Sequence, residues 1–208
     1  MKTLFATFLM LGSSVFASEP VAPVAEATKE LAVGSDAPAV KFSKFFKGTA
    51  VDKLDPNQTY LIECWAPWCV PCIAGFPHLT EIAKATEGKV TVIGVSVWDK
   101  KTTLEGFQAL VDKKGDKIGF NITSEVDGSI SKHWLEAAGR KSIPCAFIVV
   151  KGKIVWIGPP AVLTGELLNG IADGTKTAAD IPAPSGPPDN CPKPKNLDKT
   201  PPPVDDKK

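Results

Sequence analysis

The chain has 208 residues, of which 43% are apolar and 23% charged, so we expect one ordinary globular domain with tails and no second large core. Its 24 basic and 23 acidic residues give a formal net charge of +1. This balance gives no electrostatic reason to expect a nucleic-acid partner.

The first residues, "MKTLFATFLMLGSSVFA", have the pattern of a secretory signal peptide. Lys2 precedes an apolar run that ends at Phe16, and the small residue Ala17 follows. The run is shorter than the roughly 20 residues that span a bilayer, which makes an uncleaved anchor the weaker alternative. We therefore expect a signal peptide at 1–17, cleavage near Ala17, and an exported mature protein, periplasmic or secreted, without a membrane span.

Two further segments have a composition unlike that of a packed domain. Residues 18–30 are small and Pro-containing, which indicates a linker. Nine of the nineteen prolines lie between Pro182 and Pro203, with almost no large apolar residues. The sequence thus predicts a domain at 31–175 followed by a Pro-rich, extended or disordered tail at 176–208.

Inside the domain, strand and helix patterns alternate. Strand-like runs at 59–65 and 89–98 flank a helical stretch at 70–86, in which apolar residues recur every three or four positions. Pro77 lies within that stretch and should kink it. Further helices are expected at 102–114 and 127–139.

The C-terminal half of the domain ends in a hairpin and a helix. "CAFIVV" and "KIVWIG" are predicted strands joined by the Lys151-Gly152 turn, and a helix is expected at 161–173. The β-α-β order implies parallel strands, whereas the hairpin adds antiparallel ones. The predicted fold class is therefore α/β, with a mixed central sheet and helices on both faces.

The stretch "ECWAPWCVPC", residues 63–72, contains a CxxC, which can be a redox couple, half of a metal site or part of a disulfide framework. Cys69 is expected where a strand turns into a helix, and a helix N-terminus favours a thiolate. Cys72 lies one turn further along and is expected to be less exposed. Cys69 is thus the candidate nucleophile and Cys72 the resolving thiol.

A second signal is "SIPC" at 142–145. A proline at the entry to a strand is unusual and can mark a cis peptide, here Ile143-Pro144, although most such bonds are trans.

Taken together, "WAPWCVPC" before a helix and "SIPCAFIVVKGKIVWIG" resemble the thioredoxin superfamily, in particular its exported TlpA/ResA-like thiol-disulfide oxidoreductases, over residues 31–172. The resemblance implies a thioredoxin-like fold, a Cys69–Cys72 redox pair without cofactor or metal, and a cis-Pro144 facing the pair. It also implies that Trp65 and Trp68 flank the site and that the Ile143 backbone pairs with an extended chain of the bound partner.

Glu63 lies on the predicted buried strand, where thioredoxins commonly carry an acid. Burial would raise its pKa and allow proton exchange with Cys72. The lysine that often accompanies this acid is absent from the neighbouring strand.

The remaining cysteines and His78 have less specific interpretations. Cys64 and Cys145 are expected to be small buried residues, with a second disulfide as the alternative. Cys191 is expected to be an exposed tail thiol, with a tether or an auxiliary resolving thiol as the alternative. His78 is expected to be a partly exposed surface residue, with tuning of the cysteine pair as the alternative.

The sequence thus indicates an extracytoplasmic thiol-disulfide oxidoreductase, most simply a reductant of protein disulfides that is supplied by an upstream thiol donor. Two other classes stay open. Cys64, Cys69, Cys72 and Cys145 could form a thiolate metal site, although zinc sites often use two CxxC pairs and only one exists here. A noncatalytic interaction protein could use the Pro-rich tail for binding. The motif of peroxiredoxins is absent.

Overall fold

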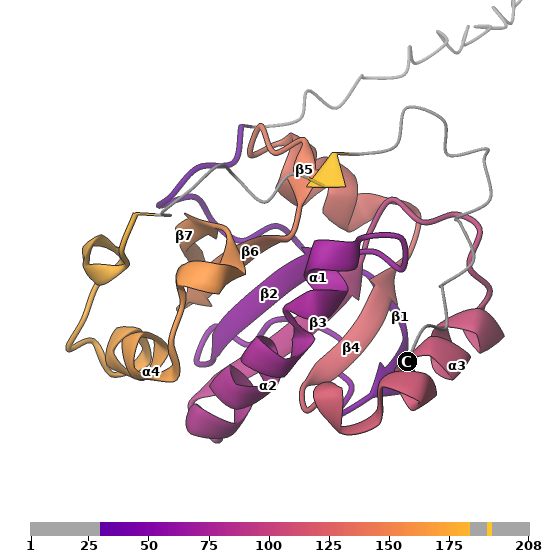
Figure 1. The fold of residues 1–208 in the computed structure, drawn as a ribbon. Helices are drawn as coiled ribbons and strands as arrows, with labels where there is room; N and C mark the ends of the chain where they lie inside the picture. The colour runs from indigo at the N-terminus through magenta and orange to yellow at the C-terminus, as the bar shows by residue number, and fades with distance from the viewer. Residues whose placement is uncertain (1–29, 184–190, 193–208) are drawn as a thin grey trace, which may run out of the picture.

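A computed structural model of the chain describes residues 30–183 and 191–192 (Figure 1). The predicted signal peptide, nearly all of the predicted linker, and residues 184–190 and 193–208 of the predicted tail lie outside the described residues. Within the described ranges, no helix has the length and apolar character needed to cross a membrane.

The core of the protein is a six-stranded mixed sheet in the order β1-β4-β3-β2-β6-β7 (Figure 1). Neighbouring strands are parallel in the pairs β2–β3 and β3–β4 and antiparallel in the other three. This arrangement confirms the predicted mixed sheet. Its strands are β1 (Phe42–Lys47), β2 (Thr59–Trp65), β3 (Val90–Ser96), β4 (Asn121–Glu125), β6 (Cys145–Val150) and β7 (Lys153–Gly158).

Strand β2 lies in the interior of the sheet and is mostly apolar, with Glu63 as its one charged residue. All seven residues of "TYLIECW" are buried. A continuous apolar run of this kind is typical of a strand covered on both faces, whereas a half-exposed strand alternates.

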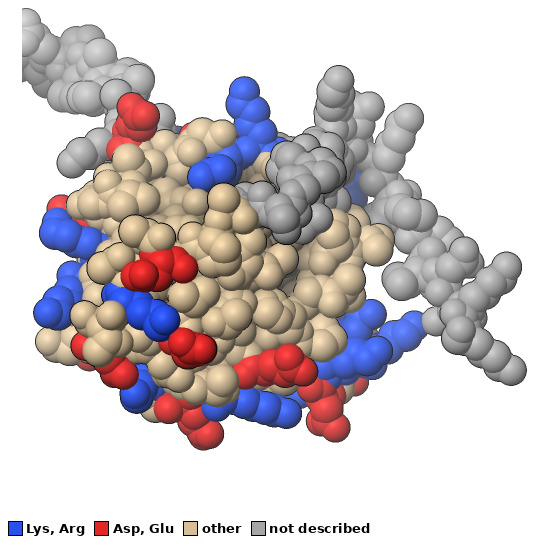
Figure 2. All heavy atoms as spheres, turned by 60° about the vertical axis from the view of Figure 1, so that its left-hand side comes forward, with Lys and Arg blue, Asp and Glu red and all other residues tan. Residues whose placement is uncertain are grey.

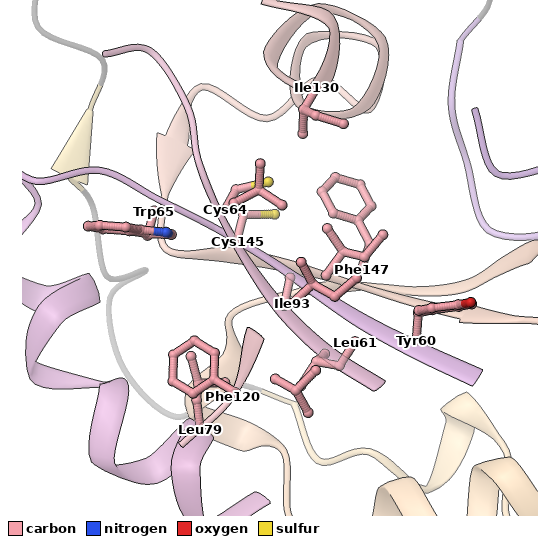
Figure 3. Close-up of a cluster of buried hydrophobic side chains, with 14 of the residues drawn as sticks. Tyr60, Leu61, Cys64, Trp65, Leu79, Ile93, Phe120, Ile130, Cys145 and Phe147 are labelled. Carbon is pink, nitrogen blue, oxygen red and sulfur yellow. The ribbon is translucent and has the colours of Figure 1, made fainter. Parts of the chain in front are cut away.

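Helices cover both faces of the sheet. The helices are α1 (Val70–Ala74), α2 (Phe76–Ala85), α3 (Leu104–Lys114), α4 (Gly165–Asp173), a π-helix (Ser131–Glu136) and short 3₁₀-helices at Gly115–Lys117, Pro160–Val162 and Ala178–Asp180. On one face the Trp65 ring lies 5.1 Å from Phe76 of α2 and 6.2 Å from Phe107 of α3. On the other face, Trp134 of the π-helix lies 5.3 Å from Phe147. Figure 3 shows Ile130 and Leu79 on opposite sides of the sheet.

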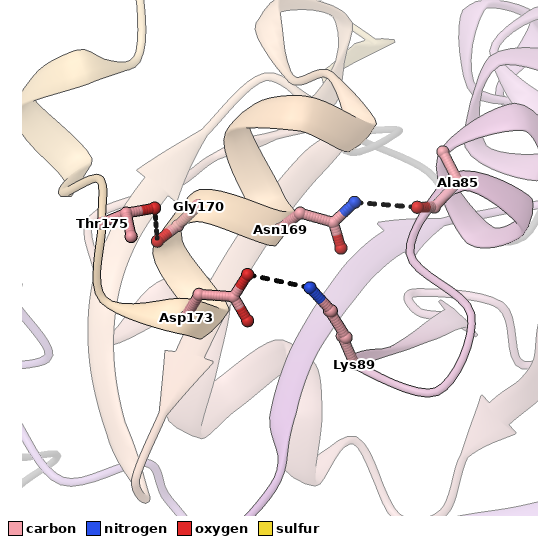
Figure 4. Close-up of polar contacts among 6 residues, drawn as sticks. All are labelled: Ala85, Lys89, Asn169, Gly170, Asp173 and Thr175. Carbon is pink, nitrogen blue, oxygen red and sulfur yellow. Dashed lines mark hydrogen bonds and ion pairs between the residues drawn. The ribbon is translucent and has the colours of Figure 1, made fainter.

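Helix α4 docks beside α2 through packing and a few polar contacts (Figure 4). The Asn169 side chain donates a hydrogen bond to the Ala85 carbonyl at 2.8 Å, and Lys89 forms a 2.8 Å ion pair with Asp173. Both ionic side chains are about half exposed, so their pair adds little stability. A Cβ at Gly165 would lie 2.5 Å from the Ala85 Cβ, so glycine permits the close approach of the two helices.

The charged side chains do not segregate by sign on the surface shown in Figure 2. Acidic and basic residues are interspersed along the lower part of that face, among the residues that the structure describes.

The helix expected at 70–86 is two helices. The chain breaks at Gly75, whose N–H donates to the carbonyls of Pro71 and Cys72, and α2 begins at Phe76. Pro77 therefore lies in the first turn of α2, and the interruption expected from it takes the form of a break between two helices just before it.

The helix expected at 127–139 is also shorter: helical structure covers residues 129–136, and within it Ser131–Glu136 form a π-helix. The Glu125 carboxylate accepts a hydrogen bond from the Ser131 N–H at 2.8 Å.

Strands β1 and β4 were not predicted. Residues 176–183, which the sequence assigns to the tail, contain the last 3₁₀-helix, and Ile181 packs against the core.

Candidate active site

The two cysteines of the CxxC are joined in a disulfide at the start of helix α1. The Cα atoms of Cys69 and Cys72 are 5.3 Å apart. Cys69 is the N-cap residue, and its sulfur accepts a hydrogen bond from the Cys72 N–H at 3.3 Å. The Cys69 N–H donates in turn to the Ala66 carbonyl at 2.9 Å, which closes the turn after β2. The sequence thus correctly predicts the strand-to-helix position of Cys69.

Exposure does not distinguish the two cysteines. Cys69 is 0% exposed and Cys72 is 2% exposed, so the expectation that Cys72 is the less exposed of the two is wrong for the disulfide state. The Cys69 sulfur turns inward to accept the backbone hydrogen bond, and Val70, at 75% exposed, occupies the surface instead.

A cavity of about 150 Å³ lies beneath the disulfide. Glu63, Cys72, His78 and Pro144 contribute to its lining. Glu63 is 1% exposed, and neither of its carboxylate oxygens has a hydrogen-bond partner among the described residues. Burial raises the pKa of Glu63 to about 8, so the carboxyl group is mostly protonated at neutral pH.

The missing lysine has a steric explanation. The residue opposite Glu63 on β3 is Gly94, and a Cβ there would lie 2.9 Å from the Phe120 ring. Phe120 and the neighbouring Trp65 indole occupy the space that a side chain on β3 would need.

His78 is half-buried, which agrees with its expected partly exposed position, but it also contributes to the lining of this cavity. Its Nε2 atom is buried and has no hydrogen-bond partner in the described part of the chain. The sequence signal was weak because a histidine on an amphipathic helix is indistinguishable from a surface residue until the position of the cavity is known.

The segment before β6 approaches the disulfide from the other side of the cavity. The Ile143-Pro144 peptide bond is cis, as the motif suggested, and Pro144 shares the cavity with Cys72. Trp68 is half-buried against the core. Trp65 is fully buried in the core beneath the site, where it contacts Phe76, rather than flanking an open surface.

Cys64 and Cys145 lie directly opposite each other on β2 and β6, and both are buried free thiols (Figure 3). The alternative of a second disulfide is therefore not realised in this structure. Burial, followed by the proximity of Cys145, raises the pKa of Cys64 well above its ordinary value. Burial also raises the pKa of Cys145 to about 12.

A metal site receives no support from this geometry. Cys69 and Cys72 are bonded to each other, and the described residues contain no group of three or more His, Cys, Asp or Glu side chains suited to hold a metal ion.

Comparisons with known proteins agree with the fold and the site. Residues 41–110 match the Thioredoxin family model. The chain is 26% identical to FixW of Rhizobium leguminosarum over 162 residues, which are 72% of this chain and 70% of FixW. It is 44% identical over 43 residues to Thioredoxin 1 of a Nostoc species, and this match covers 21% of the chain and 40% of that thioredoxin.

Two solved structures share most of the fold. A thiol:disulfide interchange protein from a Bacteroides species is 25% identical, with a TM-score of 0.54, and the match covers 73% of this chain and 95% of that one. The thioredoxin domain of a thiol-disulfide oxidoreductase from Bacteroides vulgatus is 26% identical, with a TM-score of 0.52, and the match covers 70% and 98% of the two chains.

The mixed sheet, its helices and the CxxC disulfide at a helix N-terminus define a thiol-disulfide oxidoreductase of the thioredoxin-like class. More particularly, residues 41–110 match the Thioredoxin family model, and the domain is similar to those of thiol-disulfide interchange proteins.

Replacing Glu63 by glutamine tests the cost of the buried carboxyl group. The native pKa is about 8 and the unfolded value is 4.5, so the native state retains a proton that the unfolded chain loses between these pH values. Wild-type stability should therefore fall as pH rises through this window, by at most ~5 kcal/mol at ~1.4 kcal/mol per pH unit. Denaturant unfolding should show this loss for wild type but not for Glu63→Gln.

The exposed Glu81 of α2 offers a matched control, because Glu81→Gln should leave the wild-type pH dependence in place. Identical pH profiles for Glu63→Gln and wild type would mean that Glu63 is ionised in the folded protein.

Proposed function

We propose that the protein is an exported reductant of protein disulfides, in which Cys69 is the nucleophile and Cys72 the resolving thiol. The observation that carries the proposal is the Cys69–Cys72 disulfide at the N-terminus of α1, next to Pro144. The N-terminal signal-like pattern and the resemblance to exported TlpA/ResA-like proteins support the extracytoplasmic location. We propose that the domain begins near residue 31 and, because Ile181 packs against the core, extends a few residues beyond 175.

The reaction exchanges one disulfide for another. The Cys69 thiolate of the reduced protein attacks a sulfur of the partner's disulfide, and the partner's second sulfur leaves as a thiolate that takes up a proton. Cys72 then loses its proton and attacks the Cys69 sulfur, which releases the partner as a dithiol and leaves the Cys69–Cys72 disulfide. An upstream thiol donor returns the two electrons and two protons.

Glu63 is proposed to move the proton of Cys72. The two residues line the same cavity, and no other hydrogen bond competes for the Glu63 oxygens in the described structure. The ionised carboxylate accepts the Cys72 proton during resolution, and the protonated acid returns it when the disulfide is reduced.

Trp68, Ile143 and Pro144 are proposed to bind the partner. Ile143 belongs to the short strand β5 (Ser142–Ile143), which lies outside the main sheet and can pair with an extended chain. Pro144 shares the cavity with Cys72, and the half-buried Trp68, the neighbour of Cys69 in the sequence, offers an apolar ring to the partner.

Trapping identifies the nucleophile. In Cys72→Ser/Cys191→Ser protein, neither the helix nor the tail can resolve a mixed disulfide, so reduced protein mixed with insulin should accumulate an insulin adduct on Cys69. Peptide mapping of nonreduced protein locates the adduct. The matched Cys69→Ser/Cys191→Ser variant should form none through Cys72, and an adduct there instead would assign the attack to Cys72.

The reduction potential of the Cys69–Cys72 couple determines whether the protein reduces or oxidises its partners. Equilibration with glutathione or dithiol buffers should give the Cys69–Cys72 couple a potential near about −270 mV, the range of a reductant. The fraction of oxidised protein can be read from thiol alkylation. A value near about −120 mV would identify an oxidant and overturn the proposed direction.

The Glu63→Gln variant also tests the proton step. The rate at which Cys72 resolves a preformed mixed disulfide should rise in wild type with an inflection near the Glu63 pKa of about 8. Glutamine should remove this inflection and slow resolution at pH 7 by ~100-fold, the lower end of general-base effects. Stopped-flow single turnovers measure both, with Glu81→Gln as the control. An unchanged profile would exclude Glu63 from the proton path.

A further inference from the structure

The C-terminal part of the chain returns to the proposed partner-binding strand. Cys191–Pro192 forms a short strand, β8, that pairs antiparallel with β5. In this pairing Ile143 is opposite Cys191, and Ser142 is opposite Pro192. Figure 1 shows the yellow arrow of β8 beside β5.

The pairing occupies the backbone edge that a partner would use. A strand edge pairs with one neighbour at a time, so residues 191–192 and an extended chain of another protein exclude each other at Ile143. Ile143 directly precedes Pro144, which shares the cavity with Cys72. The tail therefore pairs with the residue next to the disulfide site.

The residue at this register is a cysteine. Residues directly opposite in an antiparallel pair have Cα atoms roughly 5 Å apart, so the backbone of Cys191 lies beside that of Ile143. With β8 in place, Ile143 and Cys69 are both 0% exposed. A cysteine in an extended strand is also what a protein substrate presents to a thiol-disulfide oxidoreductase.

We propose that β8 is an internal substrate mimic, in which Cys191 exchanges with the Cys69–Cys72 disulfide while the tail closes the binding strand to other proteins. This inference rests on the proposed function, because it takes Cys69 as the sulfur that is attacked. It makes Cys191 a third redox-active cysteine of the protein.

The exchange needs no external oxidant. The Cys191 thiol gives its proton to solvent, and the thiolate attacks the Cys69 sulfur. A Cys69–Cys191 bond forms as the Cys69–Cys72 bond breaks, and Cys72 leaves as a thiolate that takes up a proton. Cys191 is thereby oxidised and Cys72 reduced, and attack by Cys72 on Cys69 reverses the step.

Attachment to the same chain favours the internal reaction. Because it is tethered, Cys191 acts at an effective concentration of ~1 mM, which exceeds the concentration of most protein partners in solution. Only a partner that binds more strongly than residues 191–192 displaces the tail, so the tail selects among disulfide substrates.

The test uses the full chain with Cys72→Ser, equilibrated with reduced and oxidised glutathione, which here acts as the oxidant. Two thiols of the protein give two electrons and two protons to one oxidised glutathione. The expected main product is a Cys69–Cys191 disulfide, found by mass spectrometry of nonreduced peptides. In the Cys72→Ser/Cys191→Ser protein, Cys69 should carry glutathione instead.

Register provides the matched control. Moving the cysteine by one residue, in Cys72→Ser/Cys191→Ser/Pro192→Cys protein, places it opposite Ser142 instead of Ile143, and consecutive residues of a strand face opposite sides. The yield of the internal disulfide should fall at least ~10-fold, since a tenfold ratio corresponds to ~1.4 kcal/mol of pairing preference. Equal yields from both positions, or glutathione on Cys69 in the Cys72→Ser protein, would overturn the inference.

Insulin reduction separates this inference from the proposed function. Cys191→Ser retains both cysteines of the helix and should reduce insulin severalfold faster than wild type. If Cys72→Ser/Cys191→Ser traps insulin on Cys69 but Cys72→Ser forms no Cys69–Cys191 bond, only the internal mimic is wrong. If no variant reacts with insulin, the proposed function itself fails.

Discussion

The burial of strand β2 on both faces is the constraint on which the site depends. The strand carries Glu63 and Trp65 toward α2, and the turn after Trp65 leads directly into the N-cap residue Cys69. Its antiparallel pairing with β6 also places Cys145, and so the preceding Pro144, at the same end of the sheet. The acid, the disulfide and the proline are therefore positioned relative to one another by a single rigid element.

The same burial determines the chemistry of the cavity. Strand β3 contains no lysine or arginine, and the Phe120 ring fills the space beside Gly94, so desolvation is the dominant influence on the Glu63 carboxyl group. The Glu63 carboxyl group beneath the disulfide therefore keeps its proton at neutral pH. A lysine paired with it would instead favour the charged carboxylate.

Most of the central sheet could be predicted from local patterns. The strands at 59–65, 145–150 and 153–158 have the predicted bounds because they are apolar and β-rich over their whole length. β1 and β4 were missed because "FSKFFK" and "NITSE" contain polar residues that satisfy neither a strict alternation nor a buried run. Their strand structure comes from pairing with each other and with β3.

Some residues of the candidate site could likewise be predicted from local sequence patterns, and others could not. Cys69, Cys72 and Pro144 are recognisable because their chemistry depends on short spacings in the sequence. The contribution of His78 to the cavity and the pairing of Ile143 with Cys191 involve residues that are distant along the chain. Local periodicity carries no information about such contacts, since they arise only when the sheet is assembled.

Cys64 and Cys145, which lie opposite each other on β2 and β6, are buried thiols of low reactivity, and this affects which cysteines of the protein can exchange disulfides. With a pKa of about 12, the Cys145 thiol is ionised in a fraction of only ~10⁻⁵ at pH 7, and the more deeply buried Cys64 is no more reactive. Burial in the hydrophobic core thus keeps two of the five cysteines of the protein out of the proposed disulfide exchange.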